Sequence, residues 1–372
     1  MVRNVKIVIG SNFGDEGKGL MTDYFAHQAI SRGEKTCVVL SNGGAQRGHT
    51  VITPDGQKHV FKHLGSGTFA GADTIIPQTF YINPIFFEME YSEILPDANI
   101  YINPHCRVTT PWHMLTNQMI EDARGENRHG SCGMGVWETK RGTPIYWSEI
   151  NTDKYDALIE LTKAELREKI PPNAPDGLLK TFEDNRLKER FKKSCEYMRK
   201  YTMDYSYPFN VYDTVIFENG QGLLLDSCLS TRYSTPSRTG IYNPANLIYS
   251  YISYTPANVE ICYVSRTYMT RHGNGRFDTE CSKEEFPGIL DDCETNVWNK
   301  YQGEFRYGRL DLDGLKKRVW EDYWQFNKPC KLSMAFTHFN EHQIDTDQID
   351  WCDNLYISDG LTRDSIIIKK EN

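Results

Sequence analysis

The stretch "IVIGSNFGDEGKGLMTDYF", residues 7–25, sets the start of the fold. A β-branched run ends at Gly10, and glycines then interrupt the chain before an apolar, helix-like segment. A second β-branched run, "KTCVVLS" at 35–41, follows. This order predicts a strand over 4–10, a glycine loop, a helix over 18–33 and a second strand parallel to the first.

The rest of the chain continues the α/β pattern. Residues 155–203 are charged and rich in Leu, Lys and Glu, which favours helices. No repeat or linker divides the chain, so we expect one domain over 1–372 with a helical subregion at about 151–205. The fold class is α/β, with a large, mostly parallel central sheet flanked by helices. Further strands are expected at 72–77, 99–103, 213–219, 260–268, 330–337 and 355–358.

Composition and charge argue against several classes of function. A net charge of −8 over 372 residues argues against a protein that coats nucleic acid. The sequence has no run of about 18 apolar residues and no signal-peptide pattern, so we expect a cytoplasmic protein without a membrane partner. The ten cysteines are scattered without a CxxC pair, which argues against a zinc site.

The loop after the first strand has the features of an anion site. Gly14, Gly17 and Gly19 allow backbone N–H groups to approach a phosphate at a helix N-terminus, and Lys18 adds a positive charge. The spacing is longer than in GxxxxGK[ST] loops, so a solvated strand–helix turn is the alternative. Asp15 is a candidate Mg²⁺ ligand or general base, and the loop alone does not decide between them.

A second glycine loop, "SNGGAQRGHTV" at 41–51, follows the second strand. His49 stands at its end, where it would face the first loop. A histidine in that place is a candidate general acid, although a single histidine is more often structural.

The two loops together, "GDEGKG" (14–19) and "NGGAQRGHT" (42–50), resemble the adenylosuccinate synthetase family. Enzymes of that family phosphorylate the 6-oxygen of a purine nucleotide from a nucleoside triphosphate and then displace the phosphate with L-aspartate. The resemblance implies a base that takes the purine N1 proton (Asp15), a group that stabilises the 6-oxygen (His49), a cation on the transferred phosphate (Lys18), and Mg²⁺ held by Asp15 and the Gly48 carbonyl.

Later segments extend the resemblance: "HGSCGMG" (129–135), "FENGQGLLLD" (217–226), "YSTPSRTG" (233–240), "TYMTRHGNGRFDTE" (267–280) and "SDGLTR" (358–363). They imply three sets of contacts. The acceptor nucleotide is assigned Gln46, Ser131, Gln221 and a hydroxyl of Thr235 or Ser237. It is also assigned a basic residue, Arg141 or else Lys140, near the position from which the family sends an arginine into the neighbouring subunit's site. The donor and its phosphate are assigned Gly14, Glu16, Gly17, Gly19, Thr337, Asn340, Ser358 and Gly360. Aspartate is assigned Thr270, Arg271, His272, Gly273 and Arg306. A homodimer that binds small molecules is implied as the working unit.

The chain departs from the family pattern at the donor base. The family ends a strand with NKxD, whose carboxylate accepts two hydrogen bonds from guanine, whereas here the strand ends "FTHFNE" with Asn340 in the acidic position. An amide cannot offer guanine two acceptors but can pair with an adenine edge. We therefore expect ATP or dATP as donor, with GTP as the alternative.

A second departure concerns the acceptor. The family's TTGRxRR loop is absent, and only Arg306 of "GEFRYGR" (303–309) keeps an arginine there. Both departures resemble the phage branch of the family, which makes 2-aminoadenylosuccinate nucleotides from dGMP, in a subgroup that retains Asp15. A carboxylate can accept from both N1–H and the 2-amino group of guanine. We expect dGMP as acceptor, with IMP plus GTP as the alternative and a simple kinase, NTPase or nucleotide-binding module as further alternatives.

Overall fold

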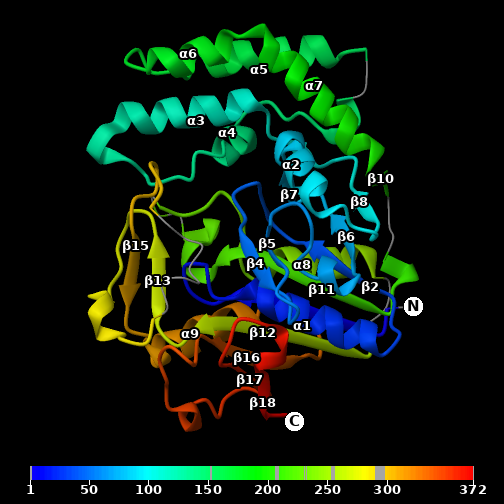
Figure 1. The fold of residues 1–372 in the computed structure, drawn as a ribbon, viewed down its shortest axis with the longest axis vertical. Coiled ribbons are helices and arrows are strands. Elements are labelled where there is room, and N and C mark those ends of the chain that lie inside the picture. Colours follow the sequence, from blue (N-terminus) through cyan, green and yellow to red (C-terminus); the bar gives the residue numbers. More distant parts are fainter. Residues whose placement is uncertain are drawn as a thin grey trace.

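The fold is seen in a computed structural model that describes residues 2–150, 153–205, 209–229, 231, 233–252, 256–289 and 298–371. Its centre is a ten-stranded sheet (Figure 1). The strands lie in the order β10 (Met203–Asp204), β8 (Ile100–Ile102), β6 (Asp73–Ile76), β2 (Thr36–Leu40), β11 (Thr214–Gly222), β1 (Asn4–Gly10), β12 (Asn258–Arg266), β16 (Lys331–Thr337), β17 (Asn354–Ser358) and β18 (Ile366–Lys370).

All neighbouring strands in this sheet pair in parallel except the last pair, β17 and β18. The expected fold class is therefore confirmed, and all eight expected strands are present in the sheet. The sequence reading missed β10 and β18 at the two edges. β10 has only two residues, and β18 exposes two of its isoleucines, so neither has the buried apolar run by which the others were recognised.

Alternating side chains of β1 enter two hydrophobic cores, one on each face of the sheet. Ile7 and Ile9 belong to one core and Val8 to the other. The core that contains Val8 also includes Ile159, Phe182 and other residues of the helical subregion. The helical subregion therefore shares one hydrophobic core with that face of the sheet. Among the described residues no helix is both long enough and apolar enough to span a bilayer.

Helices pack against the sheet, and further helices form a layer at one end of the molecule. The helical subregion contains α5 (Tyr155–Arg167), α6 (Asp176–Glu183) and α7 (Asn185–Lys200), of which only α6 was not expected. In Figure 1 these helices form a layer above α3, far from β18. The remaining helices are α1 (Lys18–Ser31), α2 (Pro84–Ile94), α3 (Pro111–Arg124), α4 (Val136–Arg141), α8 (Tyr242–Tyr251) and α9 (Leu312–Tyr323).

Three small sheets flank the main one. A hairpin of β4 (His49–Ile52) and β5 (Lys58–Phe61) lies beside α1. The other two sheets are β3 (Gly43–Gly44), β7 (Phe80–Ile82) and β9 (Arg107–Val108), and β13 (Met269–His272), β15 (Phe305–Gly308) and β14 (Glu280–Cys281). Glycine loops follow the carboxyl ends of β1, β2 and β11, which are adjacent in the main sheet. This is the edge at which open α/β sheets bind ligands.

Candidate active site

The loop between β1 and α1 holds Asp15 in a disfavoured conformation. Asp15 has φ 62°, between Gly14 at φ 99° and Gly17 at φ 90°. A non-glycine residue in this region is uncommon and is kept there by its surroundings. One such contact comes from the end of β12, where Arg266 Nε donates to the carbonyl oxygen of Asp15 at 2.6 Å.

Glu16 is turned inward and braces the loop from inside. Its Oε1 accepts from the backbone N–H of Asn12 at 3.0 Å and of Gly14 at 2.8 Å, and its Oε2 accepts from Lys18 Nζ at 2.6 Å. Both partners of the Glu16–Lys18 ion pair are almost fully buried. Glu16 lines the same cavity as Lys18, but its carboxylate is already engaged with its own loop. It therefore fixes the position of Lys18 and the path of the loop, and the N–H groups of Asn12 and Gly14 are already engaged by it.

His49 is oriented by a carboxylate from the neighbouring strand β11. Its Nδ1 lies 2.5 Å from Glu218 Oε1, and Arg47 Nη2 lies 2.8 Å from Glu218 Oε2. An ionised carboxylate can only accept, so we assign the proton of His49 to Nδ1, which donates it to Glu218. Ser66 adds two more hydrogen bonds to Glu218 through its hydroxyl and its backbone N–H. This arrangement leaves Nε2 as the nitrogen of His49 that can serve a ligand.

Charge and burial set the protonation of this pair. Burial and the adjacent Arg47 lower the pKa of His49 to about 4, although Glu218 opposes them. Burial raises the pKa of Glu218, but Arg47 and His49 outweigh it and hold that pKa below its usual range. With these pKa shifts, His49 is neutral and Glu218 is ionised near pH 7. An anion brought close to His49 would raise its pKa again.

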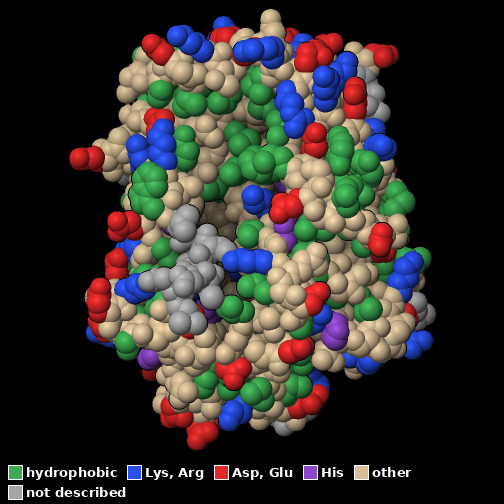
Figure 2. Space-filling view, in the orientation of Figure 1, with side chains coloured by type: hydrophobic (Ala, Val, Ile, Leu, Met, Phe, Trp, Pro, Cys, Tyr) green, Lys and Arg blue, Asp and Glu red, His purple; other side chains and the backbone are tan. Residues whose placement is uncertain are grey.

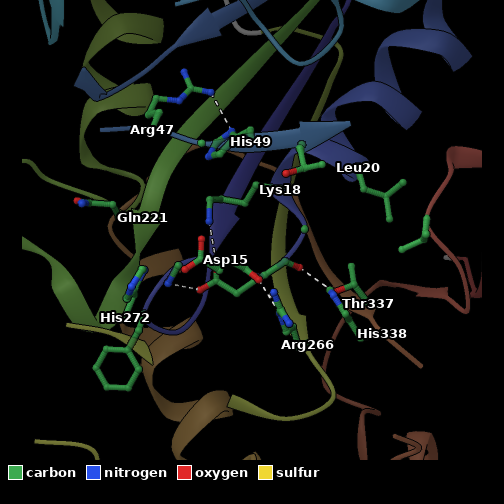
Figure 3. Close-up of a pocket in the computed structure, with 18 of the residues that line it drawn as sticks. Asp15, Lys18, Leu20, Arg47, His49, Gln221, Arg266, His272, Thr337 and His338 are labelled. Atoms are coloured by element: carbon green, nitrogen blue, oxygen red, sulfur yellow. Dashed lines mark hydrogen bonds and ion pairs between the residues drawn. The ribbon is translucent and has the colours of Figure 1, made fainter. Parts of the chain in front are cut away.

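A cavity of about 260 Å³ brings the predicted catalytic residues together. Figure 3 shows Asp15 and Lys18 near its centre, with Arg47 and His49 on one side and Thr337 and His338 on another. The predicted catalytic, metal and donor residues that line it are Gly14, Asp15, Glu16, Gly17, Lys18, Gly19, Gly48, His49, Thr337, Asn340 and Gly360. Ser358 does not line it; its hydroxyl donates to the Gly360 carbonyl at 2.9 Å and so shapes the loop.

The end of β16 closes this cavity on the side of the expected donor base. Thr337 Oγ1 donates to the carbonyl oxygen of Glu16 at 2.8 Å, which joins β16 to the glycine loop. His338 has φ 61°, and burial followed by the charge of Arg266 lowers its pKa well below the usual value. His338 is thus a neutral group at pH 7.

A second cavity, of about 750 Å³, adjoins the first. Figure 2 shows a hollow in the middle of this face of the molecule, and the cavity is lined in part by residues of α3 and α4. All five residues expected at the acceptor nucleotide line this cavity: Gln46, Ser131, Arg141, Gln221 and Thr235. Gln46, Gln221 and His272 line both cavities, so the two spaces share a wall.

Several buried polar atoms around the second cavity lack hydrogen-bond partners among the described residues. They include both side-chain polar atoms of Gln46, Oε1 of Gln221, and the hydroxyls of Thr235 and Ser237. Buried polar groups in native proteins are normally paired, so an unpaired set at a cavity indicates a polar ligand. A ligand with several oxygen and nitrogen atoms would satisfy them.

Only part of the segment expected to hold aspartate lines the second cavity. Arg271, His272 and Gly273 line it, whereas Thr270 and Arg306 do not. Arg306 binds the Glu280 carboxylate and donates to the carbonyl of Gly275 at 2.9 Å, so its guanidinium braces the segment 273–280. The assignment of aspartate to Arg306 remains a prediction without structural support.

The predicted metal ligands fit a partial coordination shell. Asp15 and Gly48 line the same cavity, and the described residues contain no group of three or more His, Cys, Asp or Glu that could hold a metal alone. Mg²⁺ is commonly held by one or two protein oxygens, with substrate phosphates and water completing the shell. The donor set therefore suits Mg²⁺ bound together with a nucleotide.

Sequence reasoning missed several residues of this site. Glu218 was within a quoted motif but was not assigned a role, although an acidic residue inside the apolar run "TVIFEN" is an unusual signal. Arg47, Arg266 and Arg318 also contact the loops; Arg318 Nε donates to the Ser11 carbonyl at 2.7 Å. Arg47 lies inside the second glycine loop and Arg266 inside an expected strand, and these placements were the available signals.

Comparison with known proteins defines the class. The family model described as adenylosuccinate synthetase matches residues 7–320. The chain belongs to the adenylosuccinate synthetase family.

Individual relatives are distant. The chain is 30% identical to the adenylosuccinate synthetase of Microcystis aeruginosa over 298 residues, which is 75% of this chain and 63% of that protein. Against the Limosilactobacillus reuteri enzyme the identity is 28%, over 75% of this chain and 65% of the relative. The matched region thus spans less than two thirds of these relatives' length.

Two solved structures share the fold. One is the cyanophage S-2L succinoaminodeoxyadenylate synthetase (PurZ) bound to dGMP and dATP as an energy donor, with TM-score 0.64 and 15% identity, covering 99% of this chain and 96% of that one. The other is the fully ligated adenylosuccinate synthetase of Plasmodium falciparum, with TM-score 0.66 and 17% identity, covering 95% of this chain and 80% of that one.

Proposed function

We propose that this protein is a ligase that joins L-aspartate to C6 of a purine nucleotide, with hydrolysis of a nucleoside triphosphate. One observation carries the proposal. Asp15, Lys18 and His49 line a cavity that shares a wall with a second, larger cavity lined by unpaired buried amide and hydroxyl groups. This arrangement suits phosphoryl transfer between a donor on one side and an acceptor base on the other.

The chemistry has two steps. In the first, the Asp15 carboxylate takes the N1 proton of the purine, and the 6-oxygen attacks the γ-phosphorus of the donor. The bond from that phosphorus to the bridging oxygen breaks, and the nucleoside diphosphate leaves. In the second, the neutral amine of aspartate attacks C6, the C6–O bond breaks so that inorganic phosphate departs with the 6-oxygen, and the new C–N nitrogen loses one proton to the departing phosphate. Lys18 and the N–H groups of the glycine loop hold the phosphoryl group throughout.

His49 acts at the 6-oxygen. With Nδ1–H directed at Glu218, the opposite nitrogen faces the substrate and carries a proton once the anionic phosphates raise the pKa of the ring. A proton at Nε2 stabilises the negative charge that develops on the 6-oxygen. Bound Mg²⁺, with Asp15 and Gly48 among its ligands, would neutralise charge on the donor phosphates.

For the acceptor we propose dGMP, with IMP as the alternative. Guanine carries a 2-amino group beside N1–H, and the Asp15 carboxylate can accept from both. The fold-level similarity to a phage enzyme bound to dGMP and dATP supports the same choice. We further propose, as the resemblance implies, a homodimer acting in the cytoplasm, that of the host if the chain is phage-encoded, with the whole chain as one catalytic unit.

The acceptor test is a steady-state assay of aspartate-dependent phosphate release. dGMP, GMP and IMP are each offered with ATP, dATP and GTP, and the product is checked for a succino group. We expect the highest kcat/KM with dGMP and an adenine donor. Turnover confined to IMP plus GTP would overturn the dGMP proposal, and phosphate release that ignores aspartate would indicate a kinase or NTPase instead.

For the donor we propose ATP or dATP, because Asn340 lines the donor cavity where the family carries a carboxylate. The variant Asn340→Asp restores two acceptors for guanine. We expect it to raise kcat/KM for GTP relative to ATP by about 5- to 150-fold, since such a pair is worth about 1–3 kcal/mol. An unchanged ratio would mean that Asn340 does not contact the donor base.

A further inference from the structure

Helix α2 carries a buried carboxylate that lies outside both cavities. Glu90 is 4% exposed and lines neither of them. Its two oxygens accept hydrogen bonds from three consecutive backbone N–H groups, those of Lys62 at 2.7 Å, His63 at 2.6 Å and Leu64 at 3.3 Å. Successive amides that converge on one anion form a favourable binding nest. Glu90 therefore fixes the path of the chain over residues 62–64.

Two buried histidines face the same carboxylate. Nε2 of His63 accepts from the backbone N–H of Asn83, the N-cap of α2, at 2.9 Å. The neutral ring of His63 therefore carries its proton on Nδ1, which lies 3.7 Å from Glu90 Oε2. Nε2 of His59 lies 3.7 Å from Glu90 Oε1. Burial alone would raise the pKa of Glu90, but His59 and His63 outweigh it and lower that pKa to about 2, so Glu90 is an ionised acceptor at neutral pH.

Residues 62–64 lie between two contacts that reach His49 and its carboxylate partner. On one side, Phe61 pairs with His49 across the β4–β5 hairpin. On the other side, Ser66 donates to Glu218 through its backbone N–H at 3.2 Å and also through its hydroxyl. A shift of residues 62–64 would therefore move both the strand that carries His49 and a support of the carboxylate that orients its ring.

Helix α2 is itself anchored to the helical subregion. Figure 1 shows α2 between α7 and the β4–β5 hairpin. Arg190 of α7 donates to Glu88 of α2 at 2.6 Å. Tyr91 of α2 stacks on Tyr201, which directly follows α7, with ring centres 4.5 Å apart. This helix pair is the support from which the buried carboxylate reaches residues 62–64.

We propose that Glu90 is a positioning residue for phosphoryl transfer: through residues 62–64 it keeps Nδ1–H of His49 on its carboxylate partner and Nε2 towards the acceptor. The inference rests on the proposed function for the chemistry that His49 performs. Because Glu90 lines neither cavity, we expect its loss to impair the chemical step and to leave nucleotide binding intact.

The first test is steady-state kinetics of Glu90→Gln with the best substrate pair. We expect kcat to fall by about tenfold, because a small misplacement of a catalytic group is costly, while KM for each nucleotide stays within about twofold. Glu93→Gln is the matched control, since Glu93 lies on the same helix and faces His59 Nδ1 at 3.5 Å but its side chain is 67% exposed. An unchanged kcat, a change confined to KM, or equal effects of both substitutions would overturn the proposal.

The second test reads the ring of His49 directly. Nitrogen NMR spectra of protein labelled at histidine distinguish a proton on Nδ1 from a proton on Nε2, and the His49 signal is the one missing from His49→Asn. We expect the Nδ1–H tautomer in wild type and in Glu93→Gln, and a mixture of tautomers in Glu90→Gln. If Glu90 only stabilised the fold, a folded Glu90→Gln would keep the wild-type tautomer, and that result would contradict the proposal.

Folding and turnover are checked separately. Thermal unfolding shows whether Glu90→Gln is folded, and Glu90→Asp, which keeps the charge on a shorter side chain, decides the question if it is not. A lower kcat at unchanged KM in folded Glu90→Asp supports the proposal, whereas wild-type kcat and tautomer refute it. The tautomer is read without substrate, so a wild type that shows Nδ1–H at His49 but no aspartate-dependent turnover would contradict the proposed function alone.

Discussion

Backbone strain in the described part of the chain concentrates at the proposed catalytic cavity. Among the described residues, four that are not glycine have positive φ. Three of these four, Asp15, Gln221 and His338, line the first cavity. Such conformations are unfavourable and persist only where packing and hydrogen bonds enforce them. Each of the three ends or follows a different parallel strand. The strain therefore supports a site whose side chains are aimed in advance of ligand binding.

The pair His49–Glu218 leads to the first prediction. We expect Glu218→Gln to lower kcat by about 10²-fold with little change in the acceptor KM, because the amide no longer directs Nε2 of His49 and no longer favours its charged form. The measurement is steady-state kinetics with the best substrate pair.

Two checks accompany it. The buried Arg47 loses its counter-charge in this variant, which costs about 3–5 kcal/mol of stability, so folding is confirmed by thermal unfolding. Ser66→Ala is the control, since it removes another hydrogen bond to Glu218 but leaves His49 in contact. An unchanged kcat in a folded Glu218→Gln variant would mean that His49 needs no orienting carboxylate.

At the scale of elements, helix α9 joins two parts of the site. Arg318 donates to the carbonyl oxygen of Ser11 at 2.7 Å and binds the Asn12 side chain, both within the glycine loop. One turn later, Asp322 accepts from the backbone N–H of Ile241, at the start of α8, at 2.9 Å. Because residues four apart lie on the same face of a helix, α9 contacts both the phosphate loop and the segment that follows the acceptor hydroxyls.

The second prediction uses this helix. We expect Arg318→Ala to lower kcat/KM for the donor by about tenfold or more, because two hydrogen bonds from a charged group to the glycine loop are lost. Lys317→Ala is the matched control on the same helix, since the side chain of Lys317 is 77% exposed and its ion pair with Glu321 is long. Equal effects of the two substitutions would contradict a role for Arg318 in positioning the loop.

Helix α3 has a pH-sensitive N-terminus. Nδ1 of His113 accepts from the backbone N–H of Thr110 at 3.1 Å in a capping box, and burial lowers the pKa of His113 to about 3. The unfolded chain, in which the usual pKa is about 6.5, therefore binds a proton first as pH falls. The contribution of His113 to stability is complete above pH 6.5 and is lost as pH falls towards 3.

The third prediction follows from this loss of stability as pH falls. Between pH 6.5 and 5 we expect His113 to account for about 2 kcal/mol of lost stability, and we expect His113→Asn to be correspondingly less sensitive to pH. Urea unfolding at both pH values measures the difference. His105→Asn, at an exposed position, should unfold with the wild-type pH dependence. An identical pH dependence in His113→Asn would contradict the argument.

At the scale of the whole molecule, the two cavities share a wall at the carboxyl ends of neighbouring central strands, β2 and β11. Ligands that bind only the folded chain stabilise it by mass action. The fourth prediction is that dGMP at 100 times its Kd adds about 2.7 kcal/mol to the free energy of unfolding, measured by urea unfolding with and without nucleotide. If ATP stabilised the protein but dGMP, GMP and IMP did not, the protein would bind a donor nucleotide and no acceptor nucleotide. That result would contradict the prediction.

Local patterns in the sequence were enough to predict the eight main strands, the helices α1, α5 and α7, and the two glycine loops. These features depend on residues close together in the chain, such as the apolar run that ends at Gly10. The weakest strands were missed because β10 and β18 bury little apolar surface. The ligand contacts expected of Glu16 and Arg306 remain predictions, since the Glu16 carboxylate is engaged with the backbone of its own loop and the Arg306 guanidinium with the carbonyl of Gly275 on a neighbouring segment.

The sequence alone determined the class of the protein, because loop glycines, Asp15, Lys18 and His49 lie in short motifs whose chemistry is local. Only the tertiary structure decided which distant residues complete the site. Glu218 reaches His49 across 169 positions and Arg318 reaches Ser11 across 307. These contacts depend on β11 lying between β1 and β2 and on α9 packing under the glycine loop. Strand order and helix packing arise from burial of the whole chain, and no short stretch of residues specifies them.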